Sequence, residues 1–304
     1  MAISIYPITS SFAAEIGDVD LAQPLDAATV GAIKQAFWDY AVLIFPGQEL
    51  TEAQHLEFAM HIGPIEPSIG AYRPDAKLRL RPDMVDVSNL NSRNEIWGET
   101  SRVRLLNLGN RLWHTDSSFK YLPARASILY GRSIAPIGGH TEFADLRAAY
   151  DALPAEMKKR VEGLIAEHAL AYSRKRTGYA LNETENKELP PVPQMMVRTI
   201  PENGRKSLYI ASHIGHIFGM SDGEAMPLVD RLIAHATQRQ FVYTHRWRLH
   251  DLVMWDDRCT MHRGTAFDDL KWTRDMHRAT VSDIANTCEQ AGISVPASPY
   301  QAPL

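Results

Sequence analysis

The sequence predicts a mostly β fold, a jelly roll or barrel with helical insertions. Short strand-like runs recur along the chain at residues 41–45, 126–134, 241–247, 252–256 and 274–282. Helical periodicity is concentrated at the front and in the middle of the chain. Many short strands with grouped helices are typical of sheets that close on a common core. Because no internal repeat and no clean linker is found, we expect residues 1–304 to form one domain.

Two helices and one strand are predicted near the N-terminus. Asp26 caps a helix whose hydrophobic residues recur at helical spacing, namely Val30, Ile33, Phe37 and Tyr40. The hydrophobic run 41–45 follows as a buried strand and ends at a Pro-Gly pair. Thr51 and Gln54 then form a capping box, which predicts a second helix that continues to about His61.

The rest of the chain combines further helices with two long irregular segments. Helical patterns cover residues 144–150, 154–164 and 221–233. Residues 66–110 and 173–196 lose this pattern among polar residues, charges and prolines, so we expect both to act as lids over a binding site. Residues 286–304 are polar and rich in proline, and we expect a loosely held tail there.

The composition is that of an ordinary globular protein. Hydrophobic residues make up 45% and charged residues 22%, and the 32 basic and 36 acidic side chains give a net charge of −4. This balance does not favour nucleic acid or an anionic membrane as a partner. No hydrophobic run approaches the ~18 residues that span a bilayer, and the start of the chain does not resemble a secretion signal. Because Cys259 and Cys288 are the only cysteines, we expect a cytoplasmic protein. We also expect it to form homo-oligomers.

A histidine and a carboxylate stand two residues apart in a stretch, 112–119, that is predicted as a strand. Side chains at this spacing on a strand point to the same face, so His114 and Asp116 can address one point. His262 follows the strand 252–256 and a turn, where it can supply a second imidazole. Two histidines and one carboxylate with open positions opposite them form the facial triad of non-haem Fe(II) oxygenases. The alternative is that His114 is an ordinary surface or core histidine.

Arg274 and Arg278 lie four residues apart shortly after His262, so they share a face of either a strand or a helix. A buried guanidinium needs an anionic partner and suits carboxylates. The pair can therefore hold two organic acids, a co-substrate and a substrate. The alternative is that both are surface arginines that pair with Asp268, Asp269 or Asp275. Three further polar residues can face the same pocket or play structural roles, and they are Asn110, Thr141 and His213.

These residues carry a resemblance to a known family. Residues 113–119 (WHTDSSF), 138–145 (GGHTEFAD) and 255–264 (WDDRCTMHRG) resemble the taurine dioxygenase family of Fe(II)- and 2-oxoglutarate-dependent dioxygenases. Within the family, the chain is most similar to the 2,4-dichlorophenoxyacetate (aryloxyalkanoate) branch. The similarity extends from about residue 12 to residue 283. It implies a double-stranded β-helix, which is a variant of the jelly roll.

The resemblance also implies a role for each candidate residue. His114, Asp116 and His262 would bind Fe(II), while Thr141 and Arg274 would bind the distal carboxylate of 2-oxoglutarate. The substrate's acidic end would face Arg278 and Asn110. His213 is added as a third candidate substrate residue because it can face the same pocket.

The chain departs from the family at two places. Asp257 stands where the family commonly has asparagine. The 2,4-dichlorophenoxyacetate branch has a lysine in the loop around Ala71 that helps to hold the substrate carboxylate, and Arg73 is the candidate replacement here.

The implied reaction consumes O2 and 2-oxoglutarate and hydroxylates the carbon next to an ether oxygen of a small anionic substrate. The product collapses to a phenol and glyoxylate, and the co-substrate leaves as succinate and CO2. Three alternatives stay open. They are a family oxygenase that acts on a sulfonate, alkyl sulfate or cinnamate-like acid, a zinc hydrolase with the same triad, and a binding-only cupin-like protein.

Overall fold

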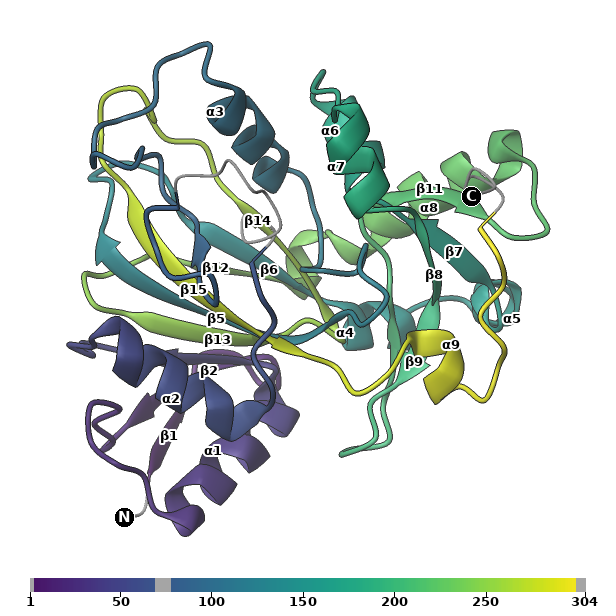
Figure 1. Cartoon of the computed structure of the whole chain (residues 1–304). Helices are drawn as coiled ribbons and strands as arrows, with labels where there is room; N and C mark the ends of the chain where they lie inside the picture. Colours follow the sequence, from purple (N-terminus) through teal and green to yellow (C-terminus); the bar gives the residue numbers. More distant parts are fainter. Residues whose placement is uncertain (1–2, 69–77, 299–304) are drawn as a thin grey trace.

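The computed structural model describes residues 3–68 and 78–298 (Figure 1). The strands are β1 (Ser4–Pro7), β2 (Ala13–Gly17), β3 (Val42–Phe45), β4 (Val85–Asp86), β5 (Ala124–Ser133), β6 (Thr141–Asp145), β7 (Ile165–His168), β8 (Val192–Met195), β9 (Val197–Thr199), β10 (Lys206–Leu208), β11 (Ile214–Ile217), β12 (Val242–His245), β13 (Leu252–Asp256), β14 (Thr260–Gly264) and β15 (Asp275–Ser282). The helices are α1 (Ala27–Tyr40), α2 (Glu52–Ile62), α3 (Arg102–Asn107), η2 (Leu108–Arg111), α4 (Leu146–Asp151), α5 (Ala155–Val161), α6 (Leu170–Arg176), α7 (Glu183–Glu188), α8 (Asp222–Ala236), η3 (Arg239–Phe241) and α9 (Thr287–Gln290). No helix of the described ranges is long and hydrophobic enough to cross a membrane.

Most of the predicted elements form where the sequence places them. Asp26 caps α1 by accepting a hydrogen bond from the backbone N–H of Thr29, and Thr51 with Gln54 forms the capping box of α2. The strand-like runs 41–45, 126–134, 252–256 and 274–282 correspond to β3, β5, β13 and β15. The helix α8 continues through Pro227, because a capping box at Ser221 and a buried hydrophobic face hold it in place.

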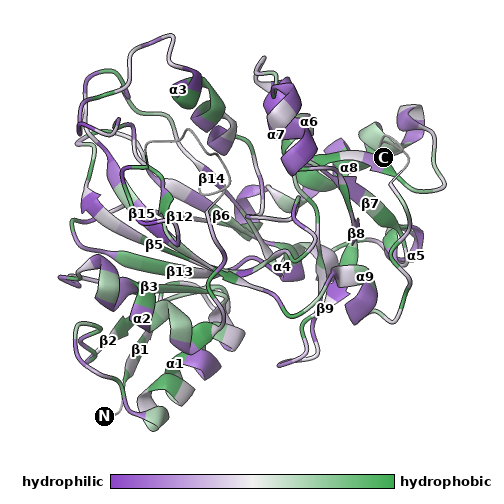
Figure 2. Cartoon of the chain, in the orientation of Figure 1, coloured by the Kyte–Doolittle hydropathy of each residue, from purple (hydrophilic) through white to green (hydrophobic). Residues whose placement is uncertain are grey.

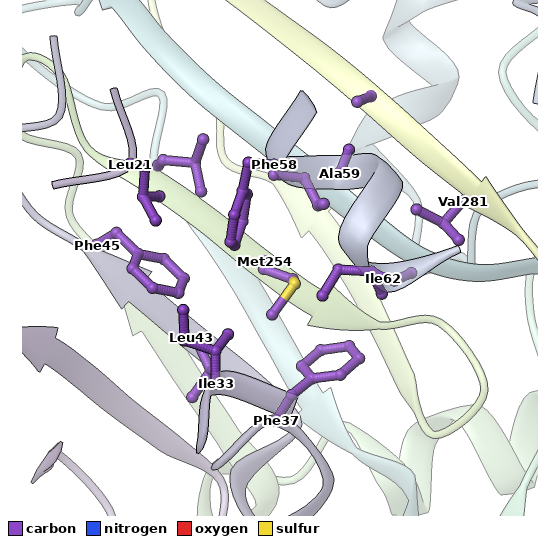
Figure 3. Close-up of a cluster of buried hydrophobic side chains, with 14 of the residues drawn as sticks. Leu21, Ile33, Phe37, Leu43, Phe45, Phe58, Ala59, Ile62, Met254 and Val281 are labelled. Carbon is purple, nitrogen blue, oxygen red and sulfur yellow. The ribbon is translucent and has the colours of Figure 1, made fainter. Parts of the chain in front are cut away.

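A seven-stranded sheet forms the centre of the molecule, with the strand order β1-β2-β3-β13-β5-β15-β4. Side chains alternate between its two faces. On β13, Leu252 and Met254 point to one face, where α1 and α2 pack against the sheet. Figure 3 shows this cluster, with Phe37 of α1 and Phe58 of α2 beside Met254. Figure 2 shows that β3 and β13 are largely hydrophobic, as burial on both faces requires.

The opposite face of the large sheet packs against a smaller sheet of order β12-β6-β14. Val253 and Trp255 of β13 contribute to this core, and the Trp255 ring lies 5.3 Å from that of Phe143 on β6. The space between the two sheets therefore receives inward-facing residues from β5, β13 and β15 on one side and from β6 on the other. The candidate site lies at one end of this space.

A third group of elements stands beside the two sheets (Figure 1). It contains the sheet β11-β7-β8, the pair β10-β9 and the helix α8, and its hydrophobic core extends to Ala144 of β6 and Met261 of β14. The first residues of the segment 286–298 pack here. Thr287 and Cys288 are buried, and the Thr287 hydroxyl donates a 2.6 Å hydrogen bond to Gln194 of β8. Residues 289–294 are exposed, and the loosely held tail stays a prediction.

Candidate active site

His114 and Asp116 do not lie in a strand, so the prediction of a strand over 112–119 is wrong. His114 forms only an isolated bridge with His262 of β14, in which each backbone N–H donates to the other's carbonyl at 3.0 and 2.7 Å. The chain then turns at Ser117, whose φ is +50°. The bridge brings the two histidines together directly. They lie 148 positions apart in the sequence, and no local pattern indicates this contact.

His114, Asp116 and His262 converge on one point. Each offers one ligand atom, and these atoms all lie within 4.8 Å of one another. The Asp116 carboxylate lies 4.0 Å from His114 Nε2 and 3.6 Å from His262 Nε2. All three residues are buried.

The electrostatics of this cluster suit a divalent metal. Burial lowers the pKa of both His114 and His262, so each imidazole is neutral at neutral pH and has a lone pair for a metal. The His114 Nδ1 donates to the carbonyl of Leu112 at 2.7 Å, which leaves Nε2 as the ligand atom. Burial opposes ionisation of Asp116, yet the charge of Arg278 and a hydrogen bond from Ser127 lower its pKa. Two neutral imidazoles and one carboxylate on one side of a cavity fit the facial triad.

Asp257 supports the cluster from behind. Its Oδ1 accepts hydrogen bonds from the backbone N–H of Asp116 at 3.1 Å and from Trp255 Nε1 at 3.0 Å. Its Oδ2 is buried and has no hydrogen-bond partner among the described residues. Burial and the negative charge of Asp116 raise the pKa of Asp257 well above its usual range. The geometry is therefore that of a neutral group with one accepting oxygen, as an asparagine at this position would also supply.

A cavity of about 120 Å³ opens beside the triad and contains Arg274 and Thr141. Arg274 donates to the carbonyls of Gly139 at 3.1 Å and Val87 at 3.4 Å, and no described carboxylate oxygen lies within 4.0 Å of it. Burial lowers its pKa to about 10, so the guanidinium is still charged at neutral pH. The Thr141 hydroxyl accepts from Trp247 Nε1 at 3.0 Å, which leaves its hydrogen free to donate. The cavity thus has a charged anchor and a hydroxyl for an anionic group.

The alternative of two surface arginines is wrong for this pair. Arg274 and Arg278 are partly buried, and two of the three acids suggested as partners pair with other arginines. Asp269 pairs with Arg104 at 2.8 Å, and Asp275 pairs with Arg79. Arg278 shares the inward face of β15 with Thr280 as predicted, but its Nη1 donates to the Asp116 carboxylate at 2.5 Å.

A larger pocket of about 810 Å³ meets the first cavity at His114, Asn110 and Arg278. The two remaining residues that the sequence suggested for substrate binding, His213 and Asn110, line this larger pocket. His213 lies with its ring 5.9 Å from the ring of His114, and its Nδ1 contacts the Ser173 hydroxyl at 2.9 Å. The Asn110 side-chain oxygen accepts a hydrogen bond from Arg174 at 3.1 Å.

Arg174 is the site residue that the sequence analysis missed. It sits on α6, is buried, and lines the larger pocket. In the sequence it opens the basic run Arg174, Lys175 and Arg176, which is typical of a solvated helix face. Only the fold shows that the first of the three turns inward.

The two predicted lids differ in structure from the expectation. Residues 173–196 are not irregular, because they contain the end of α6, α7 and β8. The described residues of 66–110 are mostly irregular as expected, but they include α3, which two arginines of its first turn hold in place. Arg104 of α3 forms two hydrogen bonds with Asp269, and Arg102 pairs with Glu185 of α7 at 2.7 Å. Arg73 lies outside the described residues. Opening and closing of these segments stays a prediction.

The family of the chain follows from comparison with known proteins. Residues 4–280 match the model of the family described as taurine catabolism dioxygenase TauD, TfdA family. The chain therefore belongs to this family.

Two relatives and one solved structure show which members of the family the chain is similar to. The chain is 39% identical to the alpha-ketoglutarate-dependent 2,4-dichlorophenoxyacetate dioxygenase of Cupriavidus pinatubonensis, over 94% of this chain and 99% of that protein. It is 35% identical to a (S)-phenoxypropionate/alpha-ketoglutarate-dioxygenase of Sphingobium herbicidovorans, over 88% of this chain and 91% of the relative. Among solved structures, AAD-2 in complex with Mn(II) and N-oxalylglycine is 44% identical with a TM-score of 0.91, covering 94% of this chain and 100% of that chain. These names do not favour the zinc hydrolase or the binding-only protein.

Proposed function

We propose that this protein is an Fe(II)- and 2-oxoglutarate-dependent dioxygenase that acts on aryloxyalkanoates such as 2,4-dichlorophenoxyacetate. The observation that carries the proposal is the meeting of two pockets at a buried His-Asp-His cluster. The smaller pocket holds Arg274, which has no carboxylate partner among the described residues. Relatives at 35–39% identity are named for aryloxyalkanoate substrates, which supports this substrate class. The fold that fits two opposed sheets in this family is the double-stranded β-helix, or jelly roll.

The chain supplies binding sites for each component. His114, Asp116 and His262 would hold Fe(II) on one side and leave the other side open to both pockets. When bound, the iron supplies O2 activation driven by oxidative decarboxylation of 2-oxoglutarate to succinate and CO2. Arg274 and Thr141 would bind the distal carboxylate of that co-substrate, since a guanidinium and a free hydroxyl hydrogen both donate to an anion.

The larger pocket would hold the substrate. Arg278, Asn110 and His213 line it and face the triad. One oxygen atom of O2 enters succinate and the other replaces a C–H bond next to the ether oxygen by C–OH. The resulting hemiacetal loses its hydroxyl proton to the departing aryl oxygen, which gives a phenol and glyoxylate. The residues' task is to fix the C–H bond near the metal and to keep bulk water out until both acids are bound.

Three expectations complete the proposal. A single domain, a cytoplasmic location and a homo-oligomeric state stay predictions from the sequence. Light scattering coupled to size-exclusion chromatography would measure the oligomeric state directly.

A substrate screen tests the proposed function. Purified protein with Fe(II) and 2-oxoglutarate should show a weak visible charge-transfer band under anaerobic conditions. After O2 is admitted, succinate release is measured with aryloxyacetates, aryloxypropionates, sulfonates and cinnamates. We expect aryloxyalkanoates to stimulate succinate release with an equal amount of phenol. Stimulation by sulfonates or cinnamates alone would reject the substrate class, and no stimulation by any acid would reject the dioxygenase.

A further inference from the structure

A second arginine without an acidic partner is buried in the substrate pocket. Arg174 of α6 is 7% exposed, and within the described part of the chain its guanidinium donates only to neutral oxygens, Asn110 Oδ1 at 3.1 Å and Ser173 Oγ at 3.2 Å. Its Nε is buried without a hydrogen-bond partner, and no carboxylate oxygen of the described ranges lies within 4.0 Å. Burial lowers the pKa of Arg174 to about 10, so it still carries its charge at neutral pH. A buried charge in this state is costly unless a ligand completes it.

The guanidinium lies where a substrate would meet the triad. It shares the 810 Å³ pocket with His114, Asp116 and His213, and its positive charge contributes to the lowered pKa of both histidines. The backbone makes room for it, because a Cβ on Gly109 would lie 2.3 Å from Arg174 Nη1. Nearby, His213 Nε2 is also buried without a partner. The pocket therefore presents a charged donor, an unpaired imidazole nitrogen and an apolar wall at Phe119, whose ring lies 4.9 Å from that of His213.

The charges around the triad distinguish three arginines. Arg278 already has an anionic partner, the Asp116 carboxylate. Arg274 and Arg174 have none in the ranges that the structure describes, and they lie in different pockets. The proposed reaction brings in two organic acids, a co-substrate and a substrate. Arg274, beside Thr141 in the smaller cavity, suits the first, which leaves Arg174 in the larger pocket for the second.

We propose that Arg174, with Asn110 and His213 beside it, binds the carboxylate of the aryloxyalkanoate and gives the enzyme its selectivity for acids. This inference rests on the proposed function and adds a specificity residue to it. A carboxylate at Arg174 completes the guanidinium's hydrogen bonds and leaves the aryl ring to the apolar part of the pocket. The carbon between the carboxylate and the ether oxygen is then held toward the triad.

Binding of a charged and an uncharged ligand tests the proposal. The protein is loaded with Mn(II) and 2-oxoglutarate, and calorimetry gives the Kd of phenoxyacetate and of neutral phenoxyacetamide. In Arg174→Gln we expect phenoxyacetate binding to weaken about tenfold or more, since hydrogen bonds to charged groups are the strong ones. Phenoxyacetamide binding should change by less than about twofold. The Kd of 2-oxoglutarate should not change.

Two further variants make the result specific. Arg176→Gln removes a charge from the same helix, where Arg176 pairs with the exposed Asp230 outside the pocket, and it should behave as the wild type. Gly109→Ala keeps Arg174 but places a methyl group against its guanidinium, so it should show the same loss for the acid alone. Because Gly109 has an ordinary backbone conformation, this variant carries the test if Arg174→Gln does not fold.

The outcomes of these binding measurements distinguish failure of the Arg174 assignment from failure of the proposed dioxygenase reaction. Equal weakening for the acid and the amide would show a structural role, and unchanged binding of both would remove Arg174 from the site. Wild-type protein that does not bind phenoxyacetate would also overturn the inference. Wild-type protein that binds phenoxyacetate through Arg174 but releases no phenol would leave the inference standing and reject the proposed reaction instead.

Discussion

The guanidinium of Arg278 donates a 2.5 Å hydrogen bond to the carboxylate of Asp116, so the arginine of β15 is joined to a candidate metal ligand. A further bond from Ser127 at 2.7 Å holds the other carboxylate oxygen. Asp116 is therefore oriented from two sides. The spacing of Arg274 and Arg278 predicts that both face the cavity, but their different partners are visible only in the structure.

This pairing changes what loss of Arg278 should do. The residue was expected to affect the substrate alone. Since Arg278 orients Asp116, we expect Arg278→Ala to weaken Mn(II) or Fe(II) binding by about tenfold, the usual effect of removing a group that holds a ligating carboxylate. Metal titration followed by electron paramagnetic resonance measures this directly. Because Arg278→Lys keeps the charge, its metal affinity should lie between those of the wild type and Arg278→Ala. Wild-type metal affinity in Arg278→Ala would show that the hydrogen bond has no role in metal binding.

The three candidate ligands should act as a unit. Alanine at His114, Asp116 or His262 should abolish metal binding and succinate formation, because two remaining ligands cannot hold the ion in one geometry. Circular dichroism should show an intact fold in each variant. His61→Ala, on the surface-facing part of α2, is the matched control and should bind metal normally. A triple alanine variant that still consumes 2-oxoglutarate with O2 would reject the assignment.

The charge of Arg274 should contribute to binding of the co-substrate and not to the stability of the fold. It is buried without a described carboxylate partner, so Arg274→Gln should not lower the melting temperature appreciably. The same variant should raise the KM for 2-oxoglutarate by about tenfold or more, since a hydrogen bond to a charged group contributes roughly 1.5–3 kcal/mol. Thr141→Val should raise it less. Unchanged KM values in both variants would place the distal carboxylate elsewhere.

The chemistry of the side chains identifies most residues of the candidate site in the sequence. The local structure predicted for His114 and Asp116 is wrong. His114 and Asp116 are recognisable because His262 can complete their ligand set and because the motif around them resembles that of a known family. Their convergence was attributed to a strand, whereas a single backbone bridge to His262 produces it. The helices α1 and α2 are predicted correctly because their caps and hydrophobic spacing are local signals. Arg174 is not predicted, because burial of one basic residue among three depends on contacts with Gly109 and Asn110, which lie 65 and 64 positions away.

Asp257 should tolerate an amide but not an aliphatic side chain. Its hydrogen bonds from Asp116 and Trp255 are both accepted by Oδ1, and Oδ2 has no partner within the described part of the chain. Asp257→Asn keeps the accepting oxygen, so we expect metal affinity within about threefold of the wild type. Asp257→Leu leaves the Trp255 indole N–H and the Asp116 backbone N–H without an acceptor and should weaken metal binding by about tenfold or more. Equal effects of the two substitutions, measured by metal titration, would show that the hydrogen bonds do not position Asp116.

His55 should make the folded state sensitive to acid. It is 1% exposed under the large sheet, where Nε2 donates to the carbonyl of Ile128 at 3.0 Å, and burial lowers its pKa to about 4. The unfolded chain has a histidine pKa near 6.5, so it binds this proton first as the pH falls. Stability from the neutral ring is therefore complete above pH ~6.5 and is lost toward pH ~4, by up to about 3 kcal/mol.

Urea unfolding at pH ~7.5 and pH ~4.5 measures this loss. His55→Gln can keep the hydrogen bond to the Ile128 carbonyl but does not titrate. Its free energy of unfolding should therefore fall by about 2 kcal/mol less than that of the wild type between the two pH values. His61→Gln, on the same helix but partly exposed, should keep the wild-type difference. If His55→Gln and the wild type lost the same stability, the acid sensitivity of the fold would have to come from other buried groups.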